Sequence, residues 1–189
     1  VKVHEMFSFC PPWAVFVRHG KTVGNLEGNY IGRTESDLVG EGVEGAHKVA
    51  RQIIESGEHI DAIYCASLTR QRDTAKIIAE DIGFPVDQIR VDDLLLERAG
   101  GDFEGKPQKD FFAASEEEQI AAGAESFQAL ADRTVAIVKL AQENHPGETV
   151  LFVGSAAIGE MMRAMIKYQD HTRMFDDGPI PNTELIRFI

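Results

Sequence analysis

Residues 15–22 form a run of apolar, β-favouring side chains that ends on an arginine, a histidine and a glycine. Residues 15–17 fit a buried strand, and Gly20 permits a sharp exit that brings the backbone close to a ligand. His19 supplies a nucleophilic imidazole beside the guanidinium of Arg18, and such a pair suits a phosphoryl group. For this tripeptide taken alone, a structural histidine in a turn is the alternative.

The segment Gly20-Lys21-Thr22 also raises the possibility of a nucleotide-binding P-loop. That loop requires a glycine five residues before Gly20, and position 15 is a valine. The intervening residues are the predicted strand itself, so no loop of backbone amides is left to cradle phosphates. The sequence therefore disfavours a P-loop.

The length and composition of the chain predict a globular protein. It has 189 residues, of which 43% are hydrophobic and 26% charged, with no repeat or low-complexity tract. We expect an N-terminal extension over 1–12 and a single domain over 13–189, with a small helical insertion at about 106–124. No apolar stretch approaches the roughly 18 residues of a membrane helix, and residues 1–12 lack the pattern of a signal peptide.

The net charge and the cysteine content limit the classes of partner and the cellular compartment that we expect. The formal net charge of −12 opposes binding to nucleic acid and to anionic membranes. Cys10 and Cys65 lie in unlike contexts and give no disulfide framework, so we expect a cytoplasmic protein. A homodimer is left open. No cluster of residues has metal-ligand spacing, so neither a metal nor a cofactor is implied.

Strand-like and helix-like segments alternate along the chain. This order predicts an α/β fold, a three-layer α/β/α sandwich with a mostly parallel central sheet. In such sheets ligands bind beyond the carboxyl ends of the strands, where Arg18-His19, Ala66-Ser67 and Gly154-Ser155 lie. We expect strands at 14–18, 60–65, 89–91, 149–153 and 184–189, helices at about 42–56, 68–82, 125–144 and 157–168, and short polar helices within 108–123.

Four separated blocks, in order along the chain, resemble the motifs of the histidine phosphatase superfamily, which contains cofactor-dependent phosphoglycerate mutases and related phosphatases. The resemblance covers about residues 13–189 and implies a phosphoglycerate mutase-like fold. The blocks are Arg18-His19-Gly20 with Thr22 and Asn25; Gly32-Arg33-Thr34-Glu35-Ser36-Asp37-Leu38; Ser67-Leu68-Thr69-Arg70 with Thr74-Ala75; and Leu95-Leu96-Glu97-Arg98 with Gly101 and Phe103-Glu104-Gly105.

The resemblance implies a role for each matching residue. His19 would attack phosphorus and become a phosphohistidine, while Arg18 and Arg70 would clamp the phosphate oxygens. Glu97 would protonate the leaving alkoxide and then activate water, which requires it to hold a proton near neutral pH. The remaining candidates are Asn25 and Ser155 for phosphate, and Lys21, Thr22, Arg33, Ser67 and Arg98 for the rest of the substrate.

The last block departs from the family pattern. It should read Val-Ser-His-Gly-Gly, with its histidine as a second imidazole facing the nucleophile, but the chain has Val153-Gly154-Ser155-Ala156-Ala157. The loss of one donor costs about 10²–10³ in rate. Lys21 is expected either to restore part of the lost charge or to be an exposed loop lysine.

Three interpretations follow. The first is a phosphomonoester hydrolase with reduced or retuned activity on a small phosphorylated metabolite. The second is a non-catalytic phospholigand-binding or interaction protein on the same fold, and the third is a deliberate inactivation at position 155. The short, acidic stretch between Gly105 and Glu125 favours hydrolysis over mutase chemistry, because it is unsuited to form a sealed cationic lid.

Overall fold

A computed structural model describes residues 14–188 of the chain, and the N-terminal extension predicted for 1–12 lies outside the described residues. Five strands form one sheet in the order β3-β2-β4-β1-β5. The first four run parallel, and β5 pairs antiparallel with β1 at the edge. The strands are β1 (Ala14–Arg18), β2 (Ala62–Cys65), β3 (Arg90–Val91), β4 (Val150–Gly154) and β5 (Leu185–Phe188).

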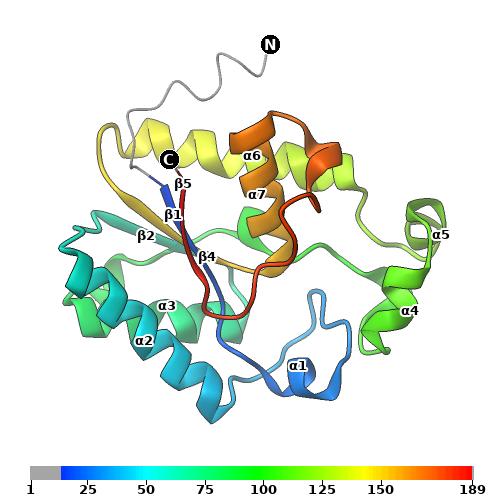
Figure 1. Cartoon of the computed structure of the whole chain (residues 1–189), viewed down its shortest axis with the longest axis horizontal. Helices are drawn as coiled ribbons and strands as arrows, with labels where there is room; N and C mark the ends of the chain where they lie inside the picture. Colours follow the sequence, from blue (N-terminus) through cyan, green and yellow to red (C-terminus); the bar gives the residue numbers. More distant parts are fainter. Residues whose placement is uncertain (1–13, 189) are drawn as a thin grey trace.

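The sheet separates two hydrophobic layers because successive side chains of a strand point to opposite faces. Phe16 and Phe152 face α6 and α7, whereas Val17 and Val153 face α2 and α3. Figure 1 shows the two pairs of helices on opposite sides of the strands. The covering helices are α2 (Gly40–Ser56), α3 (Thr69–Ile82), α6 (Phe127–Asn144) and α7 (Ala156–Tyr168). The three-layer α/β/α sandwich is therefore confirmed.

The shorter helices lie outside these layers. The stretch predicted as short polar helices contains α4 (Gln108–Ala113) and α5 (Glu116–Ala121), which stand apart from the sheet in Figure 1. One further α-helix, α1 (Val23–Glu27), follows β1. Single turns of 3₁₀-helix occur at Val86–Gln88, Asp93–Leu95, Gly101–Phe103 and His171–Arg173. Within residues 14–188, no helix is long and apolar enough to cross a membrane.

The predicted element boundaries agree with the structure to within two residues. The differences lie at the ends of the elements. For example, α2 begins at Gly40 instead of 42, and the strand predicted at 60–65 begins at Ala62. Such shifts occur where a terminal residue has the sequence character of an element but makes no regular hydrogen bond.

The carboxyl ends of β1 and β4 meet at one edge of the sheet. Arg18, the last residue of β1, is in register with Gly154, the last residue of β4. The chain then turns tightly against α2: a Cβ on Gly20 would lie 2.5 Å from the carbonyl oxygen of Gly42, so glycine is required there. This edge of the sheet therefore brings Arg18, His19 and Gly154 close together.

Candidate functional site

His19 directly follows β1 and is fixed by the backbone around it. Its N–H donates to the carbonyl of Gly154 at 2.9 Å. The ring Nδ1 lies 2.8 Å from the carbonyl oxygen of Gly20. Because a carbonyl only accepts hydrogen bonds, we assign the proton to Nδ1, which leaves the lone pair on Nε2.

The electrostatic surroundings of His19 keep its ring neutral. The residue is 3% exposed. Burial, reinforced by the positive charges of Arg70 and Arg18, holds the pKa of His19 well below its ordinary value. An imidazole that stays unprotonated retains the electron pair that a nucleophile needs.

Two guanidinium groups flank His19, that of buried Arg70 and that of half-buried Arg18, and backbone carbonyls orient both. Arg70, in the first turn of α3, donates to the carbonyls of Thr34 at 2.7 Å and Gly32 at 2.6 Å. Arg18 donates to the carbonyl of Ile180 at 2.6 Å. Burial lowers the pKa of each arginine, although arginine stays protonated in proteins. The two groups are therefore fixed cations with further N–H donors available to an anion.

The side chain of Glu97, which follows the 3₁₀ turn Asp93–Leu95, lies against the N-terminus of α7. One carboxylate oxygen accepts from the backbone N–H of Arg98 at 2.7 Å and from that of Ala157 at 3.2 Å. The carbonyl of Glu97 also accepts from the side chain of Arg33 at 3.2 Å. These bonds join three segments of the chain and hold the carboxyl group beside the cations.

A small cavity of about 80 Å³, which we name the inner cavity, brings these groups together. It joins the predicted nucleophile, both clamping arginines and the predicted acid in one place, although they come from separate segments. Its lining residues are Arg18, His19, Asn25, Asn29, Tyr30, Ile31, Gly32, Arg70, Glu97, Gln108, Phe112 and Ala156.

Asn25 is the one additional polar candidate that lines the inner cavity. Its side-chain oxygen accepts from Thr22 and from the amide of Asn182 at 3.3 Å. These bonds leave the amide nitrogen of Asn25 free to donate to an anion. Thr22 itself is fully buried as the N-cap of α1, where it forms a capping box with Asn25. The structure therefore gives Thr22 a structural position and not one in the cavity wall.

A larger cavity of about 300 Å³, the outer cavity, adjoins the inner one. The two share Arg18, Tyr30, Glu97, Gln108, Phe112 and Ala156. Its other lining residues are mostly aromatic or apolar, with one arginine and one carboxyl group among them: Arg98, Phe111, Phe127, Ala157, Glu160, Met174, Phe175 and Pro179. The organic part of a ligand whose anion lies in the inner cavity would extend here.

Lys21 does not reach the inner cavity. Its ammonium group pairs with the carboxylate of Glu41 at 3.0 Å. It lines a separate groove with residues of α2. The expectation that Lys21 replaces charge lost at position 155 is therefore not met, because Glu41 draws its side chain to α2.

Ser155 also lies away from both cavities. It is fully buried, and its hydroxyl oxygen accepts a hydrogen bond of 2.6 Å from the side-chain amide of Gln71. The prediction that Ser155 contacts phosphate does not fit this geometry, because Gln71 occupies the space beside its hydroxyl group. Ala156 and Ala157, which follow Ser155, do line the outer cavity.

The remaining three predicted substrate contacts, Ser67, Arg33 and Arg98, occupy different positions relative to the two cavities. Ser67 follows β2 half-buried and lines neither cavity. Arg33 pairs with Glu125 at 3.3 Å and supports Glu97 through the backbone. Arg98 lines the outer cavity and is 2% exposed.

The guanidinium of Arg98 is held within the wall of the outer cavity. It lies 4.0 Å from the ring centroid of Phe127. It also donates to the side chain of Gln119 at 2.8 Å and to the carbonyl of Glu125 at 2.7 Å. Arg98 therefore connects the helical insertion to α6 instead of presenting a free charge.

Several residues of the outer cavity were not predicted from the sequence. Phe112, on α4, and Phe175, after the 3₁₀ turn His171–Arg173, are aromatic side chains that are 64% and 56% exposed. Each lies in a segment otherwise rich in polar residues. Glu160 is a carboxyl group within the apolar face of α7. A large aromatic in a polar segment and an acid in an apolar helix face are the two signals that could have identified them.

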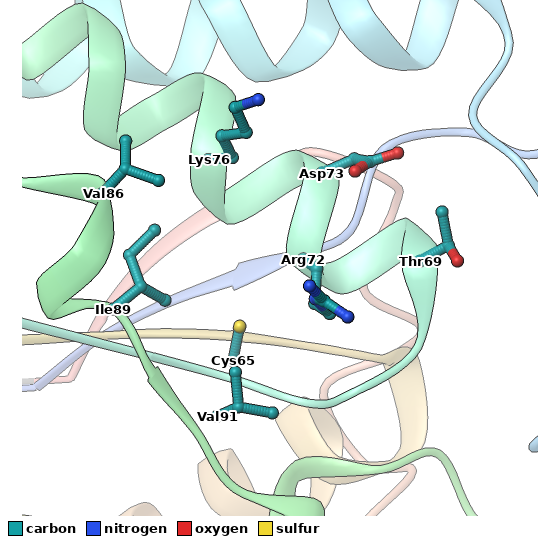
Figure 2. A pocket seen from close by; sticks show the side chains of 8 residues that line it. All are labelled: Cys65, Thr69, Arg72, Asp73, Lys76, Val86, Ile89 and Val91. Atoms are coloured by element: carbon teal, nitrogen blue, oxygen red, sulfur yellow. The ribbon is translucent and has the colours of Figure 1, made fainter.

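A further cavity of about 480 Å³ lies between α3 and β3, and Figure 2 shows the side chains that line it. Burial raises the pKa of the Cys65 thiol there to about 11, so the sulfur is not a thiolate at neutral pH. The lining residues are Cys65, Thr69, Arg72, Asp73, Lys76, Val86, Ile89 and Val91. None of the predicted site residues is among them.

Curated proteins that are similar to this chain include a phosphatase and several phosphoglycerate mutases. The metal-independent phosphoserine phosphatase of Arabidopsis thaliana is 33% identical over 149 residues, which cover 74% of this chain and 62% of that protein. A 2,3-bisphosphoglycerate-dependent phosphoglycerate mutase of Rhizobium rhizogenes is 35% identical over 106 residues, 56% of this chain and 50% of the enzyme. The chain thus matches less than two thirds of the length of these relatives.

A solved structure gives the same fold over most of the chain. A mycobacterial glucosyl-3-phosphoglycerate phosphatase in complex with VO3 aligns with a TM-score of 0.80 at 21% identity, covering 93% of this chain and 90% of that one. The family model of the histidine phosphatase superfamily (branch 1) matches residues 14–188. The chain therefore belongs to the histidine phosphatase superfamily, branch 1.

Proposed function

We propose that this protein hydrolyses phosphomonoesters through a phosphohistidine intermediate on His19. The observation that carries the proposal is the inner cavity, where a neutral imidazole lies with two oriented guanidinium groups and a carboxyl group. The cations neutralise and orient a phosphate dianion, while the imidazole remains nucleophilic. Such preorganised charge is a large contribution to catalysis of phosphoryl transfer.

In the first step, Nε2 of His19 attacks phosphorus and the bond from phosphorus to the ester oxygen breaks. Glu97 donates a proton to the departing alkoxide, which leaves as the alcohol. The Nδ1–H bond to the carbonyl of Gly20, 2.8 Å long, holds the ring in the tautomer that this attack requires. Arg18 and Arg70 keep their charge on the phosphoryl oxygens throughout.

In the second step, water attacks phosphorus and the bond between phosphorus and Nε2 breaks. The Glu97 carboxylate, left ionised by the first step, accepts the proton from the water. Free phosphate then leaves, and His19 returns to its neutral form.

Hydrolysis is favoured over mutase chemistry by the position of Arg98. A mutase must hold a second acidic group of its substrate, and the resemblance assigns that contact to this arginine. Here the guanidinium is 4.0 Å from the Phe127 ring centroid and is bonded to Gln119. Its charge is therefore committed within the cavity wall.

The second candidate function is the binding of a phosphorylated ligand without turnover. One observation favours it: position 155 carries a serine, bonded to Gln71, where the family pattern has a second imidazole. The loss of that donor lowers the expected rate by about 10²–10³. Both candidates share the anion site and differ in the fate of the ester bond.

Hydrolysis of p-nitrophenyl phosphate tests the proposal. The wild-type chain should release nitrophenol, and His19→Ala should abolish this activity because no other histidine is among the described residues that line the inner cavity. His47→Ala is the matched control, since His47 pairs with Asp81 on the surface. Turnover by His19→Ala at the wild-type rate would contradict the proposed function.

If the wild type does not hydrolyse the ester, vanadate tests whether the anion site still binds a ligand. An anion that binds the folded state raises the melting temperature. A shift that requires Arg70 would then support ligand binding without turnover.

A further inference from the structure

The mechanism above does not use Glu160, a buried carboxyl group on α7. The residue is 7% exposed, and its neighbours on the helix, Ile158, Met161 and Met162, are fully buried. One of its oxygens accepts from the backbone N–H of Ile180 at 3.1 Å. Glu160 also lines the outer cavity, so an acidic group faces the organic part of a bound ester.

The charged groups around Glu160 leave its negative charge available to a ligand. Arg163, on the same helix, bonds to the carbonyl of Gly178 and lies 3.8 Å from Asp177. Arg18 bonds to the carbonyl of Ile180 and is assigned to the phosphate. The carboxyl group of Glu97 shares the cavity with Glu160. Burial, reinforced by that second acid, raises the pKa of Glu160 to about 7, so the carboxyl group is mostly ionised at about pH 8, where the comparison of ligands is made.

The walls of the outer cavity attract cations as well. The rings of Phe112 and Phe175 are exposed, at 64% and 56%, and aromatic faces bind ammonium groups through their quadrupole. The cavity already contains one such contact, because the guanidinium of Arg98 lies over the Phe127 ring. An ammonium group between a carboxylate and these exposed rings gains both interactions.

The same cavity offers little to a substrate carboxylate. Its cations are Arg18, which serves the phosphate, and Arg98, whose Nε and Nη1 bond to the carbonyl of Glu125 and to Gln119 and whose Nη2 is buried in the wall without a hydrogen-bond partner. Two carboxyl groups, Glu97 and Glu160, face the space that remains. The charge pattern favours a positive group and opposes a negative one.

We propose that the outer cavity binds an ammonium group on the alcohol part of the substrate, with Glu160 as its anionic partner and Phe112 and Phe175 beside it. The proposal rests on the proposed phosphomonoester hydrolysis. It names the substrate class as phosphate esters of amino alcohols that carry no carboxylate.

Two matched esters test the proposal. O-phosphoethanolamine carries an ammonium group at the position where n-propyl phosphate carries a methyl group of similar size. The wild-type kcat/KM should favour O-phosphoethanolamine by about tenfold, in line with one desolvated cation contact. Glu160→Gln should bring the ratio of the two values close to one, and a general loss of activity cancels in that ratio. Glu143→Gln, an exposed residue on α6, is the matched control and should keep the tenfold preference.

The outcomes separate this inference from the proposed function. If both esters are hydrolysed at similar kcat/KM, or if Glu160→Gln keeps the preference, the inference is wrong and phosphomonoester hydrolysis stands. If neither ester is hydrolysed, calorimetry with 2-aminoethylphosphonate and n-propylphosphonate, which have no ester bond to break, measures the same preference as a ratio of Kd values. Equal Kd values would then overturn the inference.

A second variant keeps the test valid if Glu160→Gln does not fold. Phe175→Leu removes an exposed ring face but keeps an apolar side chain at the rim. The preference for the ammonium compound should fall about threefold. An unchanged preference in this variant would argue against the aromatic contribution.

Discussion

Gln71 and Ser155 form a fully buried pair joined by a hydrogen bond of 2.6 Å between α3 and the start of α7. The resemblance places an imidazole at position 155, and here the side chain at that position is enclosed and bonded to the amide of Gln71. We therefore expect a histidine at 155 to compete with Gln71 for this space.

This coupling predicts the outcome of restoring the family residue. Ser155→His alone should destabilise the protein by about 1–3 kcal/mol through overpacking and should gain little activity. In Gln71→Ala/Ser155→His the ring has room, and the rate should rise by up to about 10²–10³. Urea denaturation and kcat on p-nitrophenyl phosphate, arranged as a double-mutant cycle, measure both effects. Additive effects in the two measurements would show that the positions are independent.

At the scale of elements, the sequence was most informative where the backbone positions the chemistry. The apolar run 14–18 and the glycine after it predicted a strand tip, and parallel strands bring such tips to one edge of the sheet. Arg18 and Gly154 are accordingly in register. Arg70 joins them from the first turn of α3, and Glu97 joins them from the segment between the 3₁₀ turns Asp93–Leu95 and Gly101–Phe103.

The sequence could not predict where long side chains point. Lys21 is beside the motif in sequence, yet it turns to Glu41, a partner that α2 brings near. Arg98 was expected at the substrate, but tertiary contacts with Phe127 and Gln119 hold it in the wall. Both outcomes depend on contacts between distant segments, which motif spacing does not encode.

The helical insertion shows the same limit. Its acidic composition predicted that it is unsuited to form a sealed cationic lid, and α5 begins with three exposed glutamates. Gln108, Phe111 and Phe112 of α4 nevertheless line the cavities. The aromatic pair was visible in the sequence, but only the packing of α4 against Tyr30 directs it to the site.

At the scale of the whole molecule, Glu160 links stability to pH. Its pKa is raised from 4.5 to about 7 in the folded state, so the folded protein binds a proton that the unfolded chain releases. The resulting stabilisation is fully present below pH 4.5 and is lost as pH rises through about 7. Removing this group therefore changes the slope of stability against pH.

We predict that the free energy of unfolding of Glu160→Gln, relative to that of wild type, rises by roughly 3 kcal/mol as the pH is raised from 4.5 to 8. Each unit of pKa shift corresponds to 1.36 kcal/mol. Urea denaturation at both pH values measures the difference, and the contribution of His19 cancels because both proteins contain it. Glu143→Gln should follow the wild type at both values. A pH-independent difference between Glu160→Gln and wild type would contradict the assigned burial of this carboxyl group.

Trapping of a phosphorylated enzyme tests the phosphohistidine intermediate on His19. The wild-type chain is mixed with a ³²P-labelled phosphomonoester, quenched in alkali, where phosphohistidine survives, and digested to locate the label. We predict alkali-stable, acid-labile phosphate on the peptide that contains His19, and no label in His19→Ala. Label on another residue, or hydrolysis at the wild-type rate by His19→Ala, would contradict it.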